Sequence, residues 1–206
     1  MLQALPSPHP ALHCWAGRLA SSQREAARVA LRQQCAQALQ ARYGGSGQAS
    51  DISNTRGQAP QWLPALPAAQ PRPALALSFS YEGQYAAFAW YEGRALGIDL
   101  FALNLTDWQA QPQHWRQVTH DYLGAAQAKR IFALAAAQQA AAFAQAWSRH
   151  EAALKCLQSP LQEWQPALQA QITQLQTGLF PLLPWQAGDA QHCWALAWAL
   201  PPLASF

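Results

Sequence analysis

The feature that most constrains the fold of this chain is an order of elements that occurs twice. Over residues 22–43, apolar residues recur at helical spacing, and the glycine-rich stretch that follows ends the pattern. An alanine-rich segment, 125–157, predicts a second long helix, with Leu134 as its candidate break. Strand-like apolar segments follow each helix, at 85–90 and 193–198, roughly 110 residues apart. The repetition predicts a duplicated α+β fold.

The two copies divide the chain into an N-terminal half, 1–102, and a C-terminal half, 103–206. We expect them to be related by a pseudo-twofold axis, with the helices outside and the strands at the centre. Similar halves usually meet along a cleft, and clefts are favoured ligand sites. In the first half we expect a loop at 44–73 with one short strand near Ile52, and then a β-meander. The strands of that meander are expected at 74–80, 85–91 and 95–100.

Composition excludes several classes of protein. Half of the 206 residues are apolar and only 11% are charged, which argues against disorder. The net charge of +3 is not gathered into a basic block, so we expect no nucleic-acid partner. No run of 18 apolar residues could span a bilayer, and the N-terminal segment lacks the pattern of a signal peptide, so we expect a cytoplasmic protein. The scattered cysteines predict free thiols rather than a metal site. These are Cys14, Cys35, Cys156 and Cys193.

Two charged features stand out in this charge-poor chain. Trp147, Glu151 and Lys155 are spaced i, i+4, i+8 on the second helix, so they form one stripe. Asp99 ends an apolar strand two residues after Gly97. Taken singly, the Glu–Lys pair fits a solvated surface and the aspartate fits a turn. Taken together, Asp99 and Glu151 could share one Mg²⁺, which binds through one or two carboxylates plus phosphate oxygens and water.

At these residues the chain resembles the 4'-phosphopantetheinyl transferases of the surfactin-synthetase-activating type. That family carries a "GID" strand, here residues 97–99, and a "WxxKExxxK" helix, here residues 147–155. Its "LSHSGDY" strand is similar to the segment 77–90, and the resemblance covers roughly residues 22 to 200. It implies a pseudo-duplicated α+β fold and a Mg²⁺-dependent transfer of phosphopantetheine from coenzyme A to a serine of an acyl or peptidyl carrier protein. It also implies that Glu151 accepts the serine proton and that Lys155 offsets the leaving-group charge.

The sequence departs from the family at three positions. Phe101 stands where many members have a third carboxylate ligand, Tyr81 replaces a phosphate-contacting histidine, and His150 replaces the lysine before the helix glutamate. We expect Glu82 to supply the missing metal ligand from a neighbouring strand. We also expect Tyr81 to donate to a phosphate, and Arg149 or a protonated His150 to supply positive charge.

The resemblance extends to the binding partners. Basic residues of the first helix are expected to face the 3'-phosphate of coenzyme A, and the candidates are Arg24, Arg28 and Arg32. The carrier protein is expected to be acidic around its serine helix. Trp108 and Trp115 form a candidate docking surface for it, and the protein is expected to act as a monomer.

Two other interpretations stay open at this level. The substitutions Phe101, Tyr81 and His150 are compatible with a homologue that binds coenzyme A or a carrier protein without transfer. Alternatively, the chain is a helical scaffold in which Glu151 and Lys155 are a surface pair. Metal-dependent labelling of a carrier protein separates the first from an enzyme, and the second predicts no binding of coenzyme A.

Overall fold

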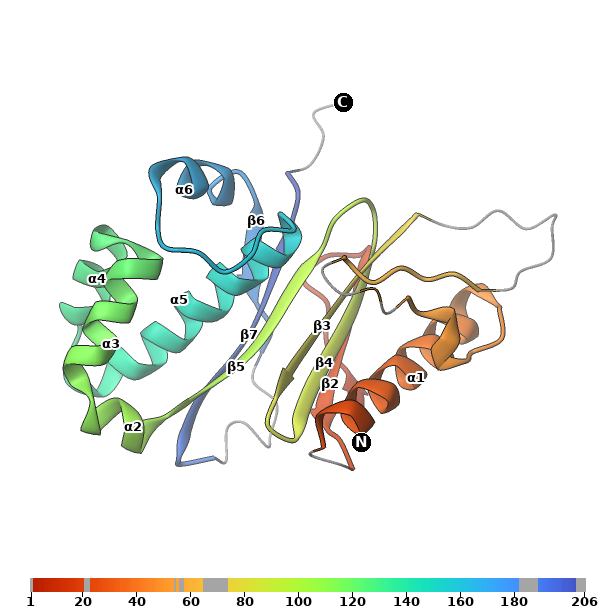
Figure 1. Ribbon diagram of the computed structural model, residues 1–206, viewed down its shortest axis with the longest axis horizontal. Helices are drawn as coiled ribbons and strands as arrows, with labels where there is room; N and C mark the ends of the chain where they lie inside the picture. Colours follow the sequence, from red (N-terminus) through yellow and green to blue (C-terminus); the bar gives the residue numbers. More distant parts are fainter. Residues whose placement is uncertain are drawn as a thin grey trace. The chain divides into compact units, whose positions relative to one another are not determined.

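The computed structural model describes residues 2–20, 23–53, 55, 58–64, 74–181 and 189–202. The chain forms two compact units that divide between Leu96 and Gly97. Each unit has its own antiparallel sheet and its own helices, so the predicted α+β class is confirmed (Figure 1). The division lies before the expected one at residue 102, and the strand that carries Asp99 therefore belongs to the second unit. The pseudo-twofold relation stays a prediction.

The first unit is a four-stranded sheet with one long helix. The strands are hydrogen-bonded in the order β1-β2-β4-β3. Their bounds are Leu2–Ala4 for β1, Leu12–Arg18 for β2, Leu75–Glu82 for β3 and Tyr85–Glu92 for β4. The helix α1 spans Arg24–Tyr43, and a short 3-10 helix η1 spans Ala49–Asp51. The N-terminal strands β1 and β2 were not predicted from the sequence, because the prolines around them mask the alternation of apolar residues.

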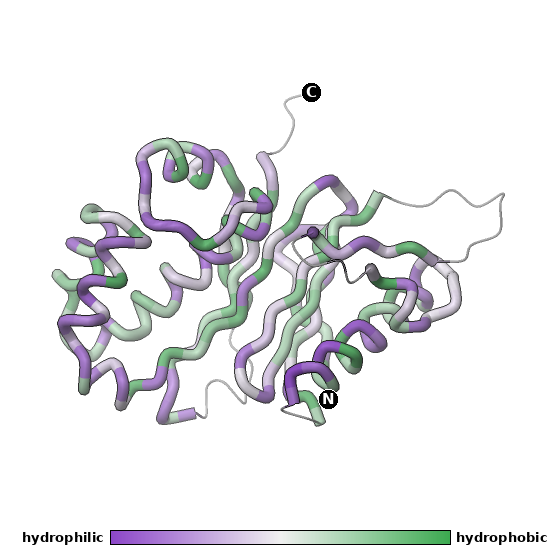
Figure 2. Tube along the Cα trace, in the orientation of Figure 1, coloured by the Kyte–Doolittle hydropathy of each residue, from purple (hydrophilic) through white to green (hydrophobic). Residues whose placement is uncertain are grey.

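The core of the first unit lies between α1 and the sheet. Leu31 and Leu39 of α1 are fully buried, one at each end of a stripe that also contains Cys35. They belong to the same apolar cluster as Phe88 and Trp90 of β4. Burying a leucine side chain contributes about 2 kcal/mol, so this stripe fixes α1 on the sheet. Figure 2 shows the apolar colouring of the strands and the mixed colouring of α1.

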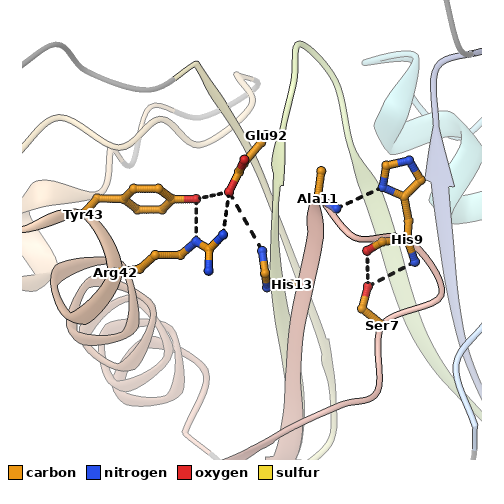
Figure 3. A network of polar contacts seen from close by, with 7 residues as sticks. All are labelled: Ser7, His9, Ala11, His13, Arg42, Tyr43 and Glu92. Atoms are coloured by element: carbon orange, nitrogen blue, oxygen red, sulfur yellow. Dashed lines mark hydrogen bonds and ion pairs between the residues drawn. The ribbon is translucent and has the colours of Figure 1, made fainter.

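A polar network holds the C-terminal end of α1 on the sheet (Figure 3). Glu92 Oε1 accepts hydrogen bonds from the Tyr43 hydroxyl at 2.6 Å and from Arg42 at 3.0 Å. These contacts lower the pKa of Glu92, the tyrosine hydrogen bond most of all. His13 of β2 lies 4.0 Å from the same oxygen. The network joins α1, β2 and β4 of the first unit, so its role is structural.

The second unit combines a three-stranded sheet with a helical layer. The strands β5 (Gly97–Asn104), β6 (Gln176–Leu179) and β7 (His192–Leu200) are in the order β5-β7-β6. In the chain, the helices of this unit come after β5 and before β6. Helix α5 packs along β5 and β7 (Figure 1). Their bounds are Leu105–Ala110 for α2, Pro112–Val118 for α3, the π-helix Thr119–Leu123 for η2, Ala125–Phe132 for α4, Ala136–Cys156 for α5 and Pro166–Ile172 for α6.

An aromatic cluster forms the core of the second unit. Phe143 of α5 is fully buried, and the rings of Trp108 and Trp115 each lie 5.3 Å from its ring centroid. Both tryptophans pack against the buried cluster that contains Leu103 and Ile131. Trp108 and Trp115 are thus partly buried against this core, and their role as a docking surface stays a prediction.

Several other predictions can now be compared with the structure. The first helix and the strands β3, β4 and β7 are confirmed, and so is the break near Leu134, which separates α4 from α5. Strand β5 is present but extends to Asn104, so Asp99 lies near its start and does not end the strand as expected. The β-meander is wrong in its third strand, because β5 pairs with β7 and not with β4. The short strand near Ile52 is an isolated bridge to Trp62. Ser22 and residues 65–73, which fall in the expected helix start and loop, lie outside the described residues. Within the described ranges no helix is long and apolar enough to cross a membrane.

Candidate active site

Strand β5 carries Asp99 into the interior of the second unit. Ile98 and Leu100, its neighbours in sequence, are buried at 0% and 2% exposure. Side chains alternate along a strand, so Asp99 and Phe101 share the opposite face. Contacts with α5 identify that face, because Asp99 bonds to Lys155 and Phe101 packs against Trp147. The carboxylate is therefore presented to the helix, and Asp99 is only 7% exposed.

Helix α5 touches β5 through its backbone. Gly97 allows this approach, since a Cβ at this position would overlap the carbonyl oxygen of Ala152 and the backbone nitrogen of Cys156. One turn earlier, the buried hydroxyl of Ser148 donates a hydrogen bond to the carbonyl oxygen of Asp99. The "GID" glycine therefore has a physical role, which is to bring the helix that carries Glu151 against the strand that carries the aspartate.

Lys155 pairs with Asp99 rather than remaining on a solvated surface. Its Nζ donates to Asp99 Oδ1 at 2.8 Å and to the carbonyl oxygen of Ile98 at 3.0 Å. The lysine side chain is 32% exposed and the aspartate side chain 10%. These two partners hold the lysine in place. Lys155 is therefore not one half of a solvated Glu–Lys surface pair.

Glu151 lies close enough to Asp99 for the two charges to interact. Burial raises the pKa of Glu151, the charge of Asp99 raises it further, and Lys155 opposes the shift. The structure thus brings Asp99, Glu151 and Lys155 together within one unit. Two adjacent carboxylates, of which Glu151 has a raised pKa, are a donor set that fits a divalent cation. Within the described part of the chain, no cluster of three or more His, Cys, Asp or Glu side chains suits a metal ion.

A cavity of about 340 Å³ opens beside the same stretch of α5. Arg149 and His150 line it, together with the side chains of Gln127 from α4, Gln169 from α6 and Thr177 from β6. His150 is 7% exposed, and burial lowers its pKa to about 4. The expectation of a protonated His150 is therefore corrected, since the imidazole is neutral at physiological pH. The exposed Arg149 is the cationic member of the pair.

In the first unit the structure gathers the residues expected to contact phosphate. Arg28 and Arg32 both lie close enough to Tyr81 to act on its hydroxyl, although burial dominates and raises the pKa of Tyr81 to about 12. Glu25 faces both arginines, with nitrogen–oxygen distances of 3.9 Å in each case. Arg24 is the first residue of α1. Tyr81 thus stays a neutral hydroxyl donor beside two guanidinium groups, which is suited to an anionic ligand.

The remaining site predictions concern Phe101 and Glu82. The ring of Phe101 packs 6.2 Å from Phe143 and 6.1 Å from Trp147, measured between ring centroids. An aromatic side chain therefore occupies the strand position where the family has a third carboxylate. Glu82 is the last residue of β3 in the first unit, and its role as a metal ligand stays a prediction.

Ser148 was missed by the sequence analysis. It is completely buried, and it bonds to Asp99 and to Ala197 of β7. Its position on the helix, three residues before Glu151, could have suggested that it shares the face of the stripe. Nothing in the spacing, however, distinguishes a buried serine of this kind from a filler residue.

An acidic pair and a lysine, held by one strand and one helix of an α+β unit, are the groups used by enzymes that act on phosphate esters. The family model of the 4'-phosphopantetheinyl transferase superfamily matches residues 95–200 of the 206, which is more than half of the chain. The chain belongs to this superfamily. A search among curated proteins found no match.

The matched segment begins just before Gly97 and ends with β7, so it contains Asp99, Glu151 and Lys155. The resemblance seen in the sequence is thereby confirmed at the level of the superfamily. The superfamily is one of phosphopantetheinyl transferases, which act on carrier proteins with coenzyme A.

Proposed function

We propose that this protein transfers the 4'-phosphopantetheine group of coenzyme A to a serine of acyl or peptidyl carrier proteins, in a Mg²⁺-dependent reaction of the surfactin-synthetase-activating type. The observation that carries the proposal is the meeting of Asp99, Glu151 and Lys155 inside the segment that matches the superfamily. Like-charged carboxylates that are close together and at least partly buried are costly unless a cation joins them. Lys155 supplies one positive charge, and a divalent ion would supply the remainder.

Asp99 and Glu151 are the residues proposed to hold Mg²⁺. When bound, the ion neutralises pyrophosphate charge and polarises the phosphorus centre. The residues of the chain perform the other tasks. Glu151 has a carboxylate whose raised pKa makes it a better proton acceptor at physiological pH, so we assign it the serine proton. Lys155 holds Asp99 in place and leaves a positive charge next to the reacting group.

The reaction balances as a single displacement at phosphorus. The serine oxygen forms a new bond to phosphorus, and the bond to the bridging oxygen of the pyrophosphate breaks. Adenosine 3',5'-bisphosphate leaves with the electron pair of that bond, and the serine proton passes to Glu151. Such transfers depend on positioning and charge neutralisation, which is what the residues of the second unit are arranged to provide.

For coenzyme A we propose two groups of contacts. Tyr81 and the arginines of α1 bind phosphate oxygens, with the 3'-phosphate as the target of the arginines, which are Arg24, Arg28 and Arg32. The cavity beside Arg149 and His150 receives another part of the molecule. Its neutral imidazole, amide and hydroxyl groups suit uncharged amides, such as those of the pantetheine arm, and Arg149 is its cationic member.

Glu82 is the proposed third ligand of the ion, and a magnesium titration tests it. Waters complete the octahedron around Mg²⁺ when protein ligands are few, so Glu82→Gln should raise the Mg²⁺ concentration for half-maximal rate while leaving the saturated rate within about tenfold. Converting Phe101 to Glu in that background should restore part of the metal affinity. Superimposable curves for the parent, the single variant and the double variant would assign Glu82 to the turn alone.

One observation favours a second candidate, a homologue that binds coenzyme A or a carrier protein without transfer. Phe101 is packed into the aromatic cluster and His150 is neutral, so one expected carboxylate and one expected cation are missing. A monomer is proposed in either case.

The deciding experiment is to incubate the purified protein with coenzyme A, Mg²⁺ and a panel of apo-carrier proteins. Intact-mass spectrometry should show the carrier gaining one phosphopantetheine group, and chelation of the metal should abolish the gain. Coenzyme A binding measured by calorimetry, without any modified carrier, would support the binding homologue. Light scattering on the same sample checks the monomer.

A further inference from the structure

One buried hydroxyl joins the helix α5 to strands β5 and β7 at the candidate site. Ser148 of α5 has no exposed surface. Its Oγ donates to the carbonyl oxygen of Asp99 at 2.5 Å and accepts from the backbone N–H of Ala197 at 3.1 Å. A hydroxyl has one proton to donate and can accept at its lone pairs, so this serine is satisfied in both roles.

The two backbone partners of Ser148 face each other in the sheet. Asp99 of β5 and Ala197 of β7 are register partners in the antiparallel pair. The hydroxyl therefore contacts the ladder at the one position where the strand carries the candidate metal ligand. A side chain that bonds to the backbone here fixes the position of α5 along its axis relative to Asp99, in addition to its packing on the sheet.

The same face of α5 also carries the residues proposed to act in the reaction. Ser148, Glu151 and Lys155 are spaced i, i+3, i+7, so they project from one side of α5. Fixing the first of them at the backbone of Asp99 determines where the other two lie relative to its carboxylate. The overlap that a Cβ at Gly97 would make with Ala152 confirms that helix and strand are in direct contact on this side.

We propose that Ser148 is a positioning residue that sets the separation of the Asp99 and Glu151 carboxylates for a divalent cation. The proposal rests on the function proposed above. Groups that orient a metal ligand without touching the metal typically change its affinity by 10- to 100-fold when they are removed. Ser148 acts through the backbone of Asp99 and through the rotation of α5, so its removal should loosen the pair without removing a ligand.

The test compares four proteins by direct binding of Mn²⁺, followed by electron paramagnetic resonance in the presence of coenzyme A. They are the parent, Ser148→Ala, Ser148→Thr and, as a control, Thr119→Val. Thr119 is also fully buried, and its hydroxyl donates to the carbonyl oxygen of Trp115 at 2.6 Å, away from Asp99. We expect Ser148→Ala to weaken Mn²⁺ binding by about tenfold or more. Ser148→Thr keeps the hydroxyl but adds a methyl group at a fully buried position, so it should bind Mn²⁺ more tightly than Ser148→Ala without needing to match the parent. Thr119→Val should lower the melting temperature alone.

Amide hydrogen exchange at Ala197 reports the hydrogen bond itself. The amide should exchange faster in Ser148→Ala than in the parent, and Ser148→Thr should restore its protection. If Ser148→Ala does not fold, Ser148→Cys replaces it, because cysteine is similar in size to serine and forms weaker hydrogen bonds. Ser148→Cys should then bind Mn²⁺ more weakly than the parent and than Ser148→Thr.

The outcomes separate this proposal from the proposed function. Parental Mn²⁺ affinity in Ser148→Ala, alongside faster exchange at Ala197, would overturn the positioning role and leave the transferase proposal intact. A parent protein that binds no Mn²⁺ in the presence of coenzyme A would overturn the metal site itself, and the positioning role with it. A loss of affinity in Thr119→Val equal to that in Ser148→Ala would show that the effect is general destabilisation.

Discussion

At the scale of single residues, the candidate site holds two carboxylates with unequal surroundings. Asp99 receives a hydrogen bond from the ammonium group of Lys155, whereas burial and the charge of Asp99 raise the pKa of Glu151. Pairs of acids whose surroundings differ in this way usually divide their roles, one staying ionised and the other exchanging protons. We propose the proton-exchanging role for Glu151, and for Asp99 the role of a ligand held by Lys155.

The division of roles predicts different costs for two substitutions. Glu151→Gln removes a proposed metal ligand and the proton acceptor together, so kcat/KM for carrier modification should fall by about 10³-fold or more. Lys155→Ala keeps both carboxylates and should cost about 10- to 100-fold. Glu163→Gln, at an exposed carboxylate before α6, is the control and should match the parent. A parental rate for Glu151→Gln would remove Glu151 from the mechanism.

The raised pKa of Glu151 also predicts how stability depends on pH. The folded state disfavours the ionised carboxylate, so its contribution to stability is present below the ordinary pKa of glutamate and is lost as pH rises through the raised value. Metal-free Glu151→Gln should therefore melt at a higher temperature than the parent at pH 7, by about 2–4 °C for each kcal/mol regained. The difference should shrink toward pH 4. Melting curves between these limits, with Glu163→Gln as reference, test the sign.

At the scale of elements, the contact between β5 and α5 determines the geometry of the site. Gly97 permits backbone contact with α5 at Ala152. Ser148 and Lys155 lie before and after that contact along the helix, and both donate hydrogen bonds to strand β5. Both elements that carry the proposed ligands are regular, so the carboxylates are placed by a strand and a helix rather than by loops. Such a site needs little rearrangement before an ion binds.

Gly97→Ala should disrupt this contact. The new methyl group would overlap backbone atoms of Ala152 and Cys156, which cannot rotate away, so we expect a loss of about 3 kcal/mol in unfolding free energy together with weaker activity. Gly83→Ala is the matched control. Gly83 has a φ of 58° but open space around its Cβ position, so the change should cost only about 1 kcal/mol. Equal losses measured by denaturant unfolding would mean that α5 has room to move.

The long periodic elements of this fold could be predicted from the sequence, and the pairing of its strands could not. Apolar periodicity located α1, β3, β4, β5 and β7. The partner of β5 was missed because β7 lies some 90 residues further along the chain, and alternation says nothing about pairing over that distance.

The same limit applied to the site. The Asp99, Glu151 and Lys155 set followed from motif spacing. The neutral state of His150 depends on burial, and the role of Ser148 depends on which backbone groups it reaches. A local pattern of residue types predicts neither the burial of His150 nor the hydrogen-bond partners of Ser148.

At the scale of the whole molecule, charge is sparse and slightly positive. The net charge of +3 arises from 13 basic and 10 acidic residues among 206. A carrier protein that is acidic around its serine would be attracted over a distance of about 8–10 Å at moderate salt. A weak, general attraction of this kind favours encounter more than it favours the chemical step.

Salt should therefore act on the carrier and not on catalysis. Raising the ionic strength from about 0.01 M to 0.15 M should increase KM for the apo-carrier several-fold and leave kcat unchanged, because screening shortens the range of attraction. An apo-carrier whose exposed carboxylates have been converted to amides serves as control and should show a flatter dependence. Initial-rate measurements at saturating coenzyme A decide the matter, and a salt-independent KM would contradict steering by charge.

The contact between Ser148 and Asp99 joins positions 49 residues apart, and α2 to α4 lie in the intervening chain. The entropy lost in closing such a loop grows only with the logarithm of its length, by about 0.6 kcal/mol for each doubling. Extra residues at an exposed turn, such as Gln111 between α2 and α3, would add little to that loss. The length of this excursion is thus free to vary while the two carboxylates stay where the strand and the helix hold them.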